Sequence, residues 1–508
     1  WELLERAGMA PDRLVDSQTG VFIGMGGSDY GAATAIQSLE DLDTHAITSN
    51  SLNVAAGRLA YTLGLQGPAL AVDTACSSSL VSLHLACQSL RSGECDLALA
   101  GGVSLMFSPY PHIALSQMQA LAADGRCKTF DATADGFGRG EGCGLVLLKR
   151  LSDAERAGDT ILAVIKGSAV NHDGHSSGLT VPNKRAQEKL LVQALVNAGI
   201  TPDAVSYIEA HGTGTALGDP IEIRALGAVF GADRATPLLV GSVKTNVGHL
   251  EAAAGIAGFM KTVLALQHRQ IPPHLHFHTP NPYIEWDAFA LEVPTVLQPW
   301  PGLAEGVAPI AGVSAFGISG TNAHVLVAAP ESDKVTGWPG DRVTAMTEPL
   351  LPENTEQARY LLPLSAKSGT ALLDLARRYQ DYVLAQPEID LGALCYTAAA
   401  GRSHFQQRIA LVAANPAELA TKLAAIVQQE EAVGLVRGAV GEEPSRIAFL
   451  FTGQGAQYVD MGRGLYATQP IFRAALERCE ALYQAYTGES LLAVLYAETG
   501  DWRRETGD

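Results

Sequence analysis

Short apolar runs alternate with alanine-rich runs of helical periodicity from residue 20 to about residue 330. The apolar runs cover residues 20–24, 69–73, 97–102, 144–149, 161–165 and 205–209. A strand that is apolar along nearly its whole length must be covered on both faces, and helices between consecutive strands supply that cover. The alternation therefore predicts an α/β domain in which helices enclose the sheets.

The composition agrees with a large buried core. Of the 508 residues, 47% are hydrophobic and 17% are charged, which excludes a disordered chain or a coiled coil. The net charge of -18 is a poor match for nucleic acid or for an anionic membrane surface. No run of 18 apolar residues occurs, and no signal peptide opens the sequence. The seven cysteines include no C-x-x-C pair, which predicts a reducing, cytoplasmic location.

The chain is predicted to contain three domains, with boundaries after residues 330 and 445. The segment 331–358 is polar and contains prolines, as linkers do. It leads into a smaller α/β unit with an amphipathic helix over 370–385, and an apolar strand at 447–451 begins the third domain. The sequence starts at Trp1 inside a helical pattern without a cap, so we expect the first domain to lack its N-terminal part.

The first motif with chemical character is Val72-Asp-Thr-Ala-Cys-Ser-Ser-Ser-Leu80. A strand enters a tight turn of small residues, and a helix is expected to start near Cys76. A thiol at a helix N-terminus meets unpaired N–H groups and the positive end of the dipole, and a stabilisation of about 1 kcal/mol lowers a thiol pKa by somewhat under one unit. The same N–H groups can hold a thioester oxyanion. Cys76 is therefore a candidate nucleophile, whereas Cys87, Cys95, Cys127 and Cys143 are interpreted as core residues.

The second motif, Glu209-Ala-His-Gly-Thr-Gly-Thr-Ala-Leu-Gly-Asp-Pro-Ile-Glu222, places a histidine where a strand ends. Its glycines allow a ligand to approach the backbone, and its threonines offer hydroxyl groups. Neither G-x-G-x-x-G nor G-x-x-x-x-G-K-[ST] occurs, so nucleotide binding is rejected. The similar run Gly136–Gly142 has the wrong spacing and is interpreted as a mobile loop or tight turn.

The third motif, Gly241-Ser-Val-Lys-Thr-Asn-Val-Gly-His-Leu-Glu-Ala-Ala-Ala-Gly255, sets Lys244, His249 and Glu251 around a turn before a small-residue helix. A lone histidine is more often structural than catalytic. Two histidines at strand or loop ends, in a chain with a cysteine at a helix start, change that balance. They could support acyl transfer to a thiolate followed by stabilisation of a carbanion.

Two further patterns are treated as decoys. Gly174-His-Ser-Ser-Gly178 matches the G-x-S-x-G elbow of serine hydrolases, but no apolar strand is expected immediately before it. His274, His276 and His278 alternate as zinc ligands on a strand could, yet the prolines before them and the missing second ligand cluster favour a surface segment. No metal site is predicted.

Taken together, the three motifs resemble the β-ketoacyl synthase of type I modular polyketide synthases over residues 1–330, and Gly317-Ile-Ser-Gly-Thr-Asn-Ala-His324 adds a fourth match. Residues 331–445 resemble the linker between ketosynthase and acyltransferase. Phe451-Thr-Gly-Gln-Gly-Ala-Gln457 resembles the opening of an acyltransferase, with Gln454 as an oxyanion-hole candidate. The resemblance implies the thiolase-like fold, with five α/β/α/β/α layers, and a homodimer whose interface includes the strand before Cys76.

The resemblance also implies a function, decarboxylative Claisen condensation of a cysteine-bound acyl chain with a malonyl-type extender on acyl carrier protein. No cofactor is expected on the chain itself, because phosphopantetheine belongs to the carrier protein. A type I fatty acid synthase ketosynthase, a cysteine hydrolase or acyltransferase, and a non-catalytic dimerisation scaffold stay open as alternatives. The implied roles are nucleophile for Cys76, decarboxylation for His211 and His249, support of the histidines for Lys244 and Glu251, phosphopantetheine contact for Thr213 and Thr215, and an oxyanion hole of the Cys76 and Phe316 amides.

Overall fold

The chain forms two compact units, which are described separately. The computed structural model describes residues 1–27, 29–34, 45–231, 234, 236–301, 308–330, 359–441, 450, 458 and 460–496. The first unit comprises 1–342 with 400–403, and the second comprises 343–399 with 404–508. The predicted boundary after residue 445 and the predicted strand 447–451 fall outside the described residues, apart from Leu450. The division into three domains therefore stays a prediction.

The first sheet of the first unit has the strand order β2-β1-β3-β4. Its strands are β1 (Thr19–Gly24), β2 (Ala69–Val72), β3 (Leu97–Ser104) and β4 (Gly142–Lys149). β1 pairs in parallel with β2 and β3, and β4 is antiparallel to β3. All six residues of β1 are buried, which confirms the prediction of strands covered on both faces.

The second sheet has the order β5-β12-β11-β6-β7-β9. Its central strands β11 and β6 are parallel, whereas β12 runs antiparallel to both of its neighbours. The bounds are β5 (Val164–His172), β6 (Val205–Glu209), β7 (Leu238–Gly241), β9 (Leu291–Glu292), β11 (Ile310–Phe316) and β12 (Thr321–Ala328), and a separate pair joins β8 (Gln270–Ile271) to β10 (Gln298–Pro299).

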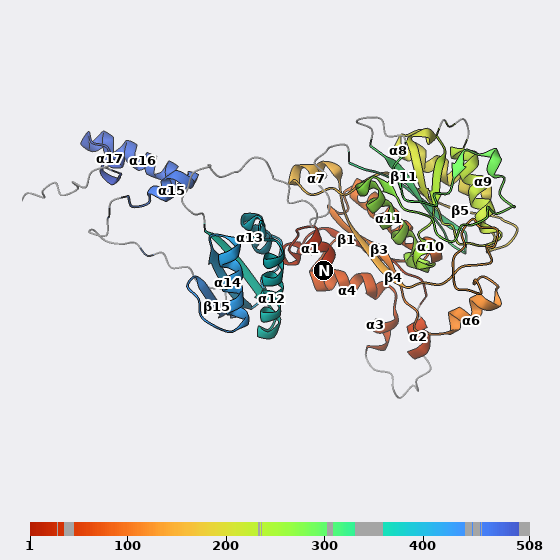
Figure 1. Ribbon diagram of the computed structural model, residues 1–508, viewed down its shortest axis with the longest axis horizontal. Helices are drawn as coiled ribbons and strands as arrows, with labels where there is room; N and C mark the ends of the chain where they lie inside the picture. Colours follow the sequence, from red (N-terminus) through yellow and green to blue (C-terminus); the bar gives the residue numbers. More distant parts are fainter. Residues whose placement is uncertain are drawn as a thin grey trace, which may run out of the picture. The chain divides into compact units, whose positions relative to one another are not determined.

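Helices form three layers, one between the two sheets and one on the outer face of each sheet (Figure 1). The central layer, α5 (Ser78–Ser92) and α11 (Ala254–His268), contacts both sheets. α4 (Asn53–Leu63) covers the outer face of the first sheet, and α8 (Lys184–Ala198) and α9 (Gly218–Phe230) cover the second. The expected five layers are therefore confirmed. The remaining helices are α1 (Glu2–Arg6), α2 (Asp29–Thr34), α3 (Ala46–Asn50), α6 (Tyr110–Gln117), α7 (Leu151–Ala157) and α10 (Lys244–Val247).

Two glycines let the first turn of α5 lie directly on the first sheet. A Cβ at Gly24 would lie 2.5 Å from backbone atoms of Ser78 and Ser79, and one at Gly102 would lie 2.7 Å from the Ser79 Cβ. Only glycine leaves room for such an approach. This packing fixes the position of the turn before α5 relative to the first sheet.

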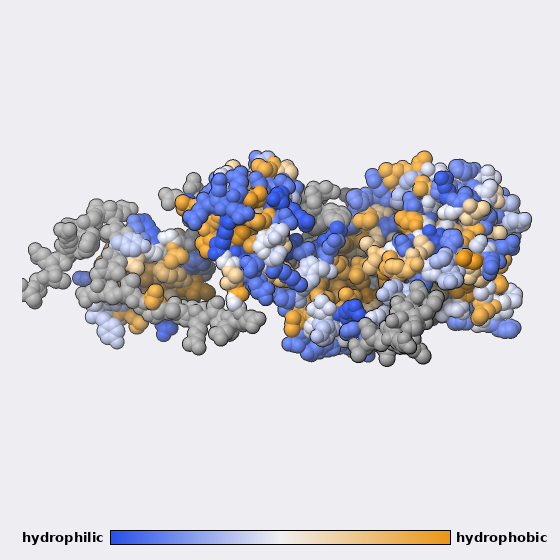
Figure 2. Space-filling model, turned by 90° about the horizontal axis from the view of Figure 1, so that it is seen from below, coloured by the Kyte–Doolittle hydropathy of each residue, from blue (hydrophilic) through white to orange (hydrophobic). Residues whose placement is uncertain are grey.

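Apolar side chains also reach the surface of this unit. β2 is an edge strand with two exposed residues, and Leu70 is 44% exposed. α6 has no buried residue, and Ile113 within it and Phe107 just before it are exposed. The face in Figure 2 carries orange, apolar areas between the blue ones. None of the helices within the described ranges has the length and apolar character that crossing a membrane requires.

The second unit contains the predicted small α/β domain. Its antiparallel sheet β13-β14-β15 consists of β13 (Tyr360–Ala366), β14 (Gln407–Ala413) and β15 (Leu435–Ala439). Buried residues alternate along β13 and β14 and pack against α12 (Gly369–Ala385), α13 (Leu391–Ala400) and α14 (Pro416–Val427). The predicted helix 370–385 is thus confirmed. Further on lie α15 (Arg463–Thr468), α16 (Pro470–Thr487) and α17 (Leu491–Leu495).

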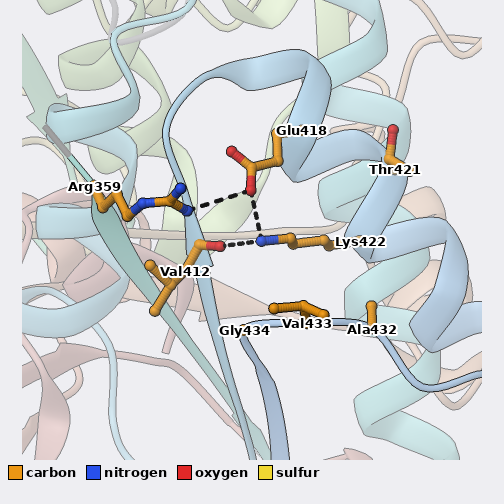
Figure 3. Close-up of a pocket in the computed structure, with 8 residues that line it drawn as sticks. All are labelled: Arg359, Val412, Glu418, Thr421, Lys422, Ala432, Val433 and Gly434. Atoms are coloured by element: carbon orange, nitrogen blue, oxygen red, sulfur yellow. Dashed lines mark hydrogen bonds and ion pairs between the residues drawn. The ribbon is translucent and has the colours of Figure 1, made fainter. Parts of the chain in front are cut away.

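A shallow hollow opens beside α14 of this domain (Figure 3). Lys422 donates to the Val412 carbonyl, and its ammonium lies 2.7 Å from the Glu418 carboxylate, which Arg359 also approaches at 3.6 Å. The Glu418 carboxylate therefore pairs with both cations of the hollow, and no cysteine or histidine lines it.

Candidate active site

Cys76 lies in a 3₁₀ turn, Ala75–Ser77, between the end of β2 and the start of α5. The preceding Ala75 has a φ of 55°, an uncommon conformation for a residue with a side chain. Side-chain hydrogen bonds hold the turn. The Ser78 hydroxyl accepts the Thr74 N–H at 2.9 Å, and the Asp73 carboxylate accepts the Ala75 N–H at 3.0 Å. The turn thus presents the partly buried thiol just ahead of α5, close to the predicted position.

The protonation of Cys76 differs from the expectation. Burial raises the pKa of this thiol to about 11, and the Glu251 carboxylate raises it further, whereas the Lys244 charge and the backbone N–H groups of Ile318 and Cys76 lower it. The expected lowering at the helix start is wrong, because loss of hydration outweighs the dipole. The thiol is protonated at neutral pH, so acylation requires that its proton be removed.

His211 follows β6 and is fixed through both its backbone and its ring. Its backbone N–H donates to the Glu222 carboxylate at 2.7 Å, and its Nδ1 accepts the Phe316 N–H at 3.3 Å. Burial, the Lys244 charge and His249 hold its pKa well below the usual value, so the ring is neutral. With Nδ1 acting as an acceptor, the proton of the neutral ring resides on Nε2.

His249 has the same arrangement in a different turn. Its Nδ1 accepts the Glu251 N–H at 3.0 Å, which again leaves the proton on Nε2. Burial, Lys244 and Arg139 hold its pKa well below the usual value. The rings of His211 and His249 lie 5.5 Å apart at 86°. The structure therefore brings together the two histidines that the sequence selected from separate motifs.

Lys244 lies at the start of α10 and is buried. Burial lowers its pKa, and the nearby Glu222 and Glu209 carboxylates oppose that effect. Its charge acts on the Cys76 thiol and on both imidazoles, favouring thiolate and disfavouring imidazolium. The supporting role expected of Lys244 stays a prediction.

Glu251 is oriented differently from the expectation. Its carboxylate forms an ion pair with Arg139, at 2.5 Å between Oε1 and Nε, and its contact with His249 is made by its backbone N–H. The sequence placed the acidic group itself in the histidine network. The structure shows that Glu251 acts on His249 through the main chain.

The predicted oxyanion hole also requires correction. The Phe316 N–H is engaged by His211 Nδ1, so it does not face the sulfur of Cys76. The backbone N–H groups that lower the pKa of this thiol belong to Ile318, two residues later, and to Cys76 itself. The Phe316 amide therefore supports the His211 ring, whereas the sequence assigned it to the oxyanion hole together with the Cys76 amide.

Thr213 and Thr215 lie together in the loop that follows His211. Their hydroxyl oxygens are 3.1 Å apart, and Thr215 also accepts the Gly218 N–H at 3.2 Å. The loop is anchored from α9, because the buried Asp219 carboxylate accepts the N–H groups of Gly214 and Phe130. Burial raises the pKa of Asp219 to about 6.

Sequence reasoning missed Arg139, Asp219, Glu222 and Ile318. Asp219 and Glu222 stood inside the quoted second motif, and their charge next to apolar residues at the start of an expected helix was the available signal. Both are buried, and Glu222 accepts the N–H groups of His211 and Gly212. Arg139 lies in a segment that the sequence pattern alone describes only as a mobile loop or tight turn.

The decoy interpretations need adjustment in detail. β5 runs to His172, so a strand does precede Gly174-His-Ser-Ser-Gly178, contrary to the expectation. The Ser176 hydroxyl donates to the Gly178 carbonyl and accepts the Gly178 N–H, so these hydrogen bonds lie within its own loop. His274 is buried, not on the surface, and bonds the Ser242 N–H through Nδ1 and the Thr129 carbonyl through Nε2. Within the described residues, no group of three metal-ligating side chains is assembled.

Comparison with known protein families identifies four matched segments. Residues 1–154 match the model described as beta-ketoacyl synthase, N-terminal domain, and residues 162–278 match its C-terminal domain. Residues 360–423 match the CurL-like C-terminal model of polyketide synthases, and residues 448–504 match an acyl transferase domain.

Curated relatives match nearly the whole chain. Polyketide synthase GfsA of Streptomyces halstedii is 46% identical over 97% of this chain, and erythronolide synthase EryA2 of Saccharopolyspora erythraea is 44% identical over 98%. The spectinabilin polyketide synthase system protein NorC of Streptomyces orinoci is 45% identical over 97%. The chain spans only 6%, 14% and 21% of these three relatives, respectively.

Two solved structures are similar throughout most of their length. The ketosynthase from module 6 of the bacillaene synthase from Bacillus subtilis 168 is 34% identical, with a TM-score of 0.72 over 98% of this chain and 81% of that one. An oxazolomycin ketosynthase domain from Streptomyces albus JA3453 is also 34% identical, with a TM-score of 0.73 over 90% of this chain and 76% of that one.

Proposed function

The chain belongs to the β-ketoacyl synthase family as it occurs in modular polyketide synthases, and from that premise we propose that residues 1–330 extend an acyl chain by decarboxylative Claisen condensation. The observation that carries this proposal is the pair of neutral imidazoles. Their Nδ1 atoms both accept backbone N–H groups, and their rings lie 5.5 Å apart. Each therefore offers an Nε2–H donor, and the Lys244 charge acts on both rings and on the Cys76 thiol.

In the first half-reaction, Cys76 attacks the thioester carbonyl of an acyl chain on an acyl carrier protein. The Cys76 proton is transferred to the departing carrier thiolate, a new C–S bond forms, and the carrier leaves as a free thiol. The raised pKa of Cys76 means that the thiolate exists only transiently, and the Lys244 charge stabilises it while it does. The backbone amides of Cys76 and Ile318 are the proposed donors to the oxyanion of the tetrahedral intermediate.

In the second half-reaction, a malonyl-type thioester on a carrier protein loses CO2. The electrons of the broken C–C bond pass to the thioester carbonyl, so no base is needed, and the developing enolate oxygen requires hydrogen-bond donors. His211 and His249 supply them, each worth about 3 kcal/mol in a site that excludes water. The enolate carbon attacks the acyl-Cys76 carbonyl, the C–S bond breaks, and the thiolate takes up one proton. A β-ketoacyl thioester remains on the carrier.

The carrier protein and its phosphopantetheine arm are the proposed partner and substrate carrier. Thr213 and Thr215, whose hydroxyls lie together beyond His211, are the proposed contacts for the arm. No cofactor held by the chain enters either half-reaction. A cytoplasmic location stays a prediction from the cysteine pattern, which is consistent with seven free thiols.

We also infer a homodimer formed through the first sheet. β2 is one of the two edge strands of this sheet, and its exposed Leu70 would be covered by a second copy of the chain. Sedimentation equilibrium of the chain measures this, and a monomer at micromolar concentration would contradict it.

Intact-mass spectrometry tests the condensation directly. The chain is mixed with a short acyl thioester and then with malonyl-loaded carrier protein, alongside Cys76→Ala and, as a matched buried cysteine on α5, Cys87→Ala. We expect an acyl adduct on the wild type and on Cys87→Ala, followed by a carrier-bound β-ketoacyl product. Release of free acid would indicate a hydrolase, and absence of any adduct would indicate a non-catalytic scaffold.

A further inference from the structure

Arg139 is a buried cation directly behind one of the two histidines. Its side chain is only 4% exposed. Its Nε lies 2.5 Å from Glu251 Oε1, and its Nη2 donates to Oε2 at 3.2 Å, so the pair is bidentate. A buried guanidinium is stable only when it is paired in this way, and the fork geometry also fixes the orientation of the carboxylate.

The loop that carries Arg139 also forms hydrogen bonds with the backbone of His249. The His249 N–H donates to the Gly138 carbonyl at 2.7 Å, and the Gly140 N–H donates to the His249 carbonyl at 2.9 Å. A Cβ at Gly138 would lie 1.9 Å from the Gly125 carbonyl oxygen, and one at Gly140 would lie 2.4 Å from that of Val247. The glycines on both sides of Arg139 therefore allow close packing, and the loop holds the His249 backbone in place.

Glu251 links the loop that carries Arg139 to the ring of His249. Its φ is 48°, a left-handed conformation that costs energy in a residue with a side chain. In this conformation its N–H donates to His249 Nδ1 at 3.0 Å and places the ring proton on Nε2. The Arg139 ion pair holds the Glu251 side chain while its backbone is in this strained state.

The same pair balances charge around the thiol. The charges that act on Cys76 are Lys244 and Glu251, and those that act on His249 are Lys244 and Arg139. The Glu251 carboxylate raises the pKa of Cys76, and the Arg139 guanidinium that pairs with it opposes the field of this carboxylate, so an unpaired carboxylate would raise the pKa further. Removal of Arg139 thus affects a group that it does not touch.

We propose that Arg139 is a positioning residue for the condensation, which fixes the Nε2–H tautomer of His249 and neutralises the Glu251 carboxylate beside Cys76. This inference rests on the proposed function for its catalytic consequence. Its electrostatic consequence at Cys76 does not depend on any acyl substrate. The two consequences are therefore measured separately.

The first measurement is the pH dependence of Cys76 alkylation by iodoacetamide in the whole chain, followed by peptide mass spectrometry with Cys143 as internal reference. Cys143 is exposed, so its interpretation as a core residue is wrong. We expect Arg139→Gln to shift the Cys76 profile to higher pH, because the unpaired carboxylate disfavours the thiolate. Arg139→Lys, which keeps the charge, should restore most of the profile. The double variant Arg139→Gln/Glu251→Gln should restore it as well, because no unpaired charge remains.

The second measurement is malonyl decarboxylation, resolved into kcat and KM. We expect Arg139→Gln to lower kcat by about 10- to 100-fold with KM nearly unchanged, because the misplaced donor acts only in the transition state. Arg139→Lys should recover only part of kcat, since a point charge does not reproduce the fork.

Two results would overturn the inference. One is an Arg139→Gln variant that loses thermal stability but keeps the wild-type alkylation profile and kcat, which would make Arg139 merely structural. The other is a double variant whose alkylation profile stays shifted as far as that of Arg139→Gln, since the effect would not then pass through Glu251. If the wild type itself does not decarboxylate, the proposed function fails, while the alkylation series still decides the electrostatic part.

Discussion

The carboxylate of Glu222 accepts the backbone N–H of His211 at 2.7 Å, so a buried acid on α9 anchors the histidine that follows β6. Its second oxygen accepts the Gly212 N–H at 2.8 Å. Burial raises the pKa of Glu222 to about 7, and the two N–H donors counteract this rise. The position of one catalytic candidate therefore depends on a side chain that does not face the substrate.

Substitution of this acid tests the anchor. Glu222→Gln keeps the shape but replaces one acceptor oxygen with an N–H2 group that faces a backbone donor. We expect a loss of about 1–3 kcal/mol in the free energy of unfolding, and at least a tenfold fall in condensation rate. Denaturant unfolding and carrier-bound product formation measure the two effects. Glu285→Gln, at a side chain 68% exposed, is the control and should match the wild type.

The pH dependence of Cys76 acylation follows from its raised pKa. Because the thiol is the stable form below about pH 11, the thiolate fraction grows about tenfold per pH unit up to that value. We expect alkylation of Cys76 to rise through pH 8 and pH 9 without a plateau. Quenched iodoacetamide reactions, analysed by mass spectrometry, measure the rate of Cys76 alkylation at each pH. A plateau near pH 7 would contradict the expectation, because it would mean that the pKa of this thiol is lowered instead of raised.

Removal of one imidazole should separate the two half-reactions. His249→Ala deletes an enolate donor but leaves the Cys76 turn intact, so we expect acylation to persist while decarboxylation falls by about 10²- to 10³-fold. Release of CO2 from malonyl-carrier protein is the measurement. His268→Ala, an exposed histidine at the end of α11, is the matched control. Equal loss of both half-reactions would place His249 in acyl transfer as well.

The close approach of α5 to the first sheet can be tested with a single methyl group. At Gly24, a Cβ would meet backbone atoms of Ser78 and Ser79 at 2.5 Å, which no side-chain movement can relieve. We expect Gly24→Ala to lower the free energy of unfolding by about 1–3 kcal/mol and to reduce Cys76 acylation. In contrast, a Cβ at Gly57 within α4 would meet no atom within 4 Å. Gly57→Ala should therefore stabilise the chain by up to about 1 kcal/mol. Thermal unfolding of both variants makes the comparison.

Much of the architecture was predictable because it depends on local pattern. The apolar runs at 20–24, 69–73, 97–102 and 205–209 coincide with β1, β2, β3 and β6 to within two residues. The run at 161–165 was placed too early, since β5 spans Val164–His172 and continues through polar residues that its neighbour β12 pairs. Strand ends depend on partners, and the partners are distant in sequence.

The sequence by itself determined which residues are the candidates for the chemistry, because Cys76, His211 and His249 lie in motifs whose residue types and local turns are visible in one dimension. Only the tertiary structure decided how they act. The Phe316 amide is directed to an imidazole, the Ile318 amide to the sulfur, and the Arg139 side chain to Glu251. Burial, which raises the pKa of Cys76 and lowers those of both histidines, is a property of the packed layers and of no local segment.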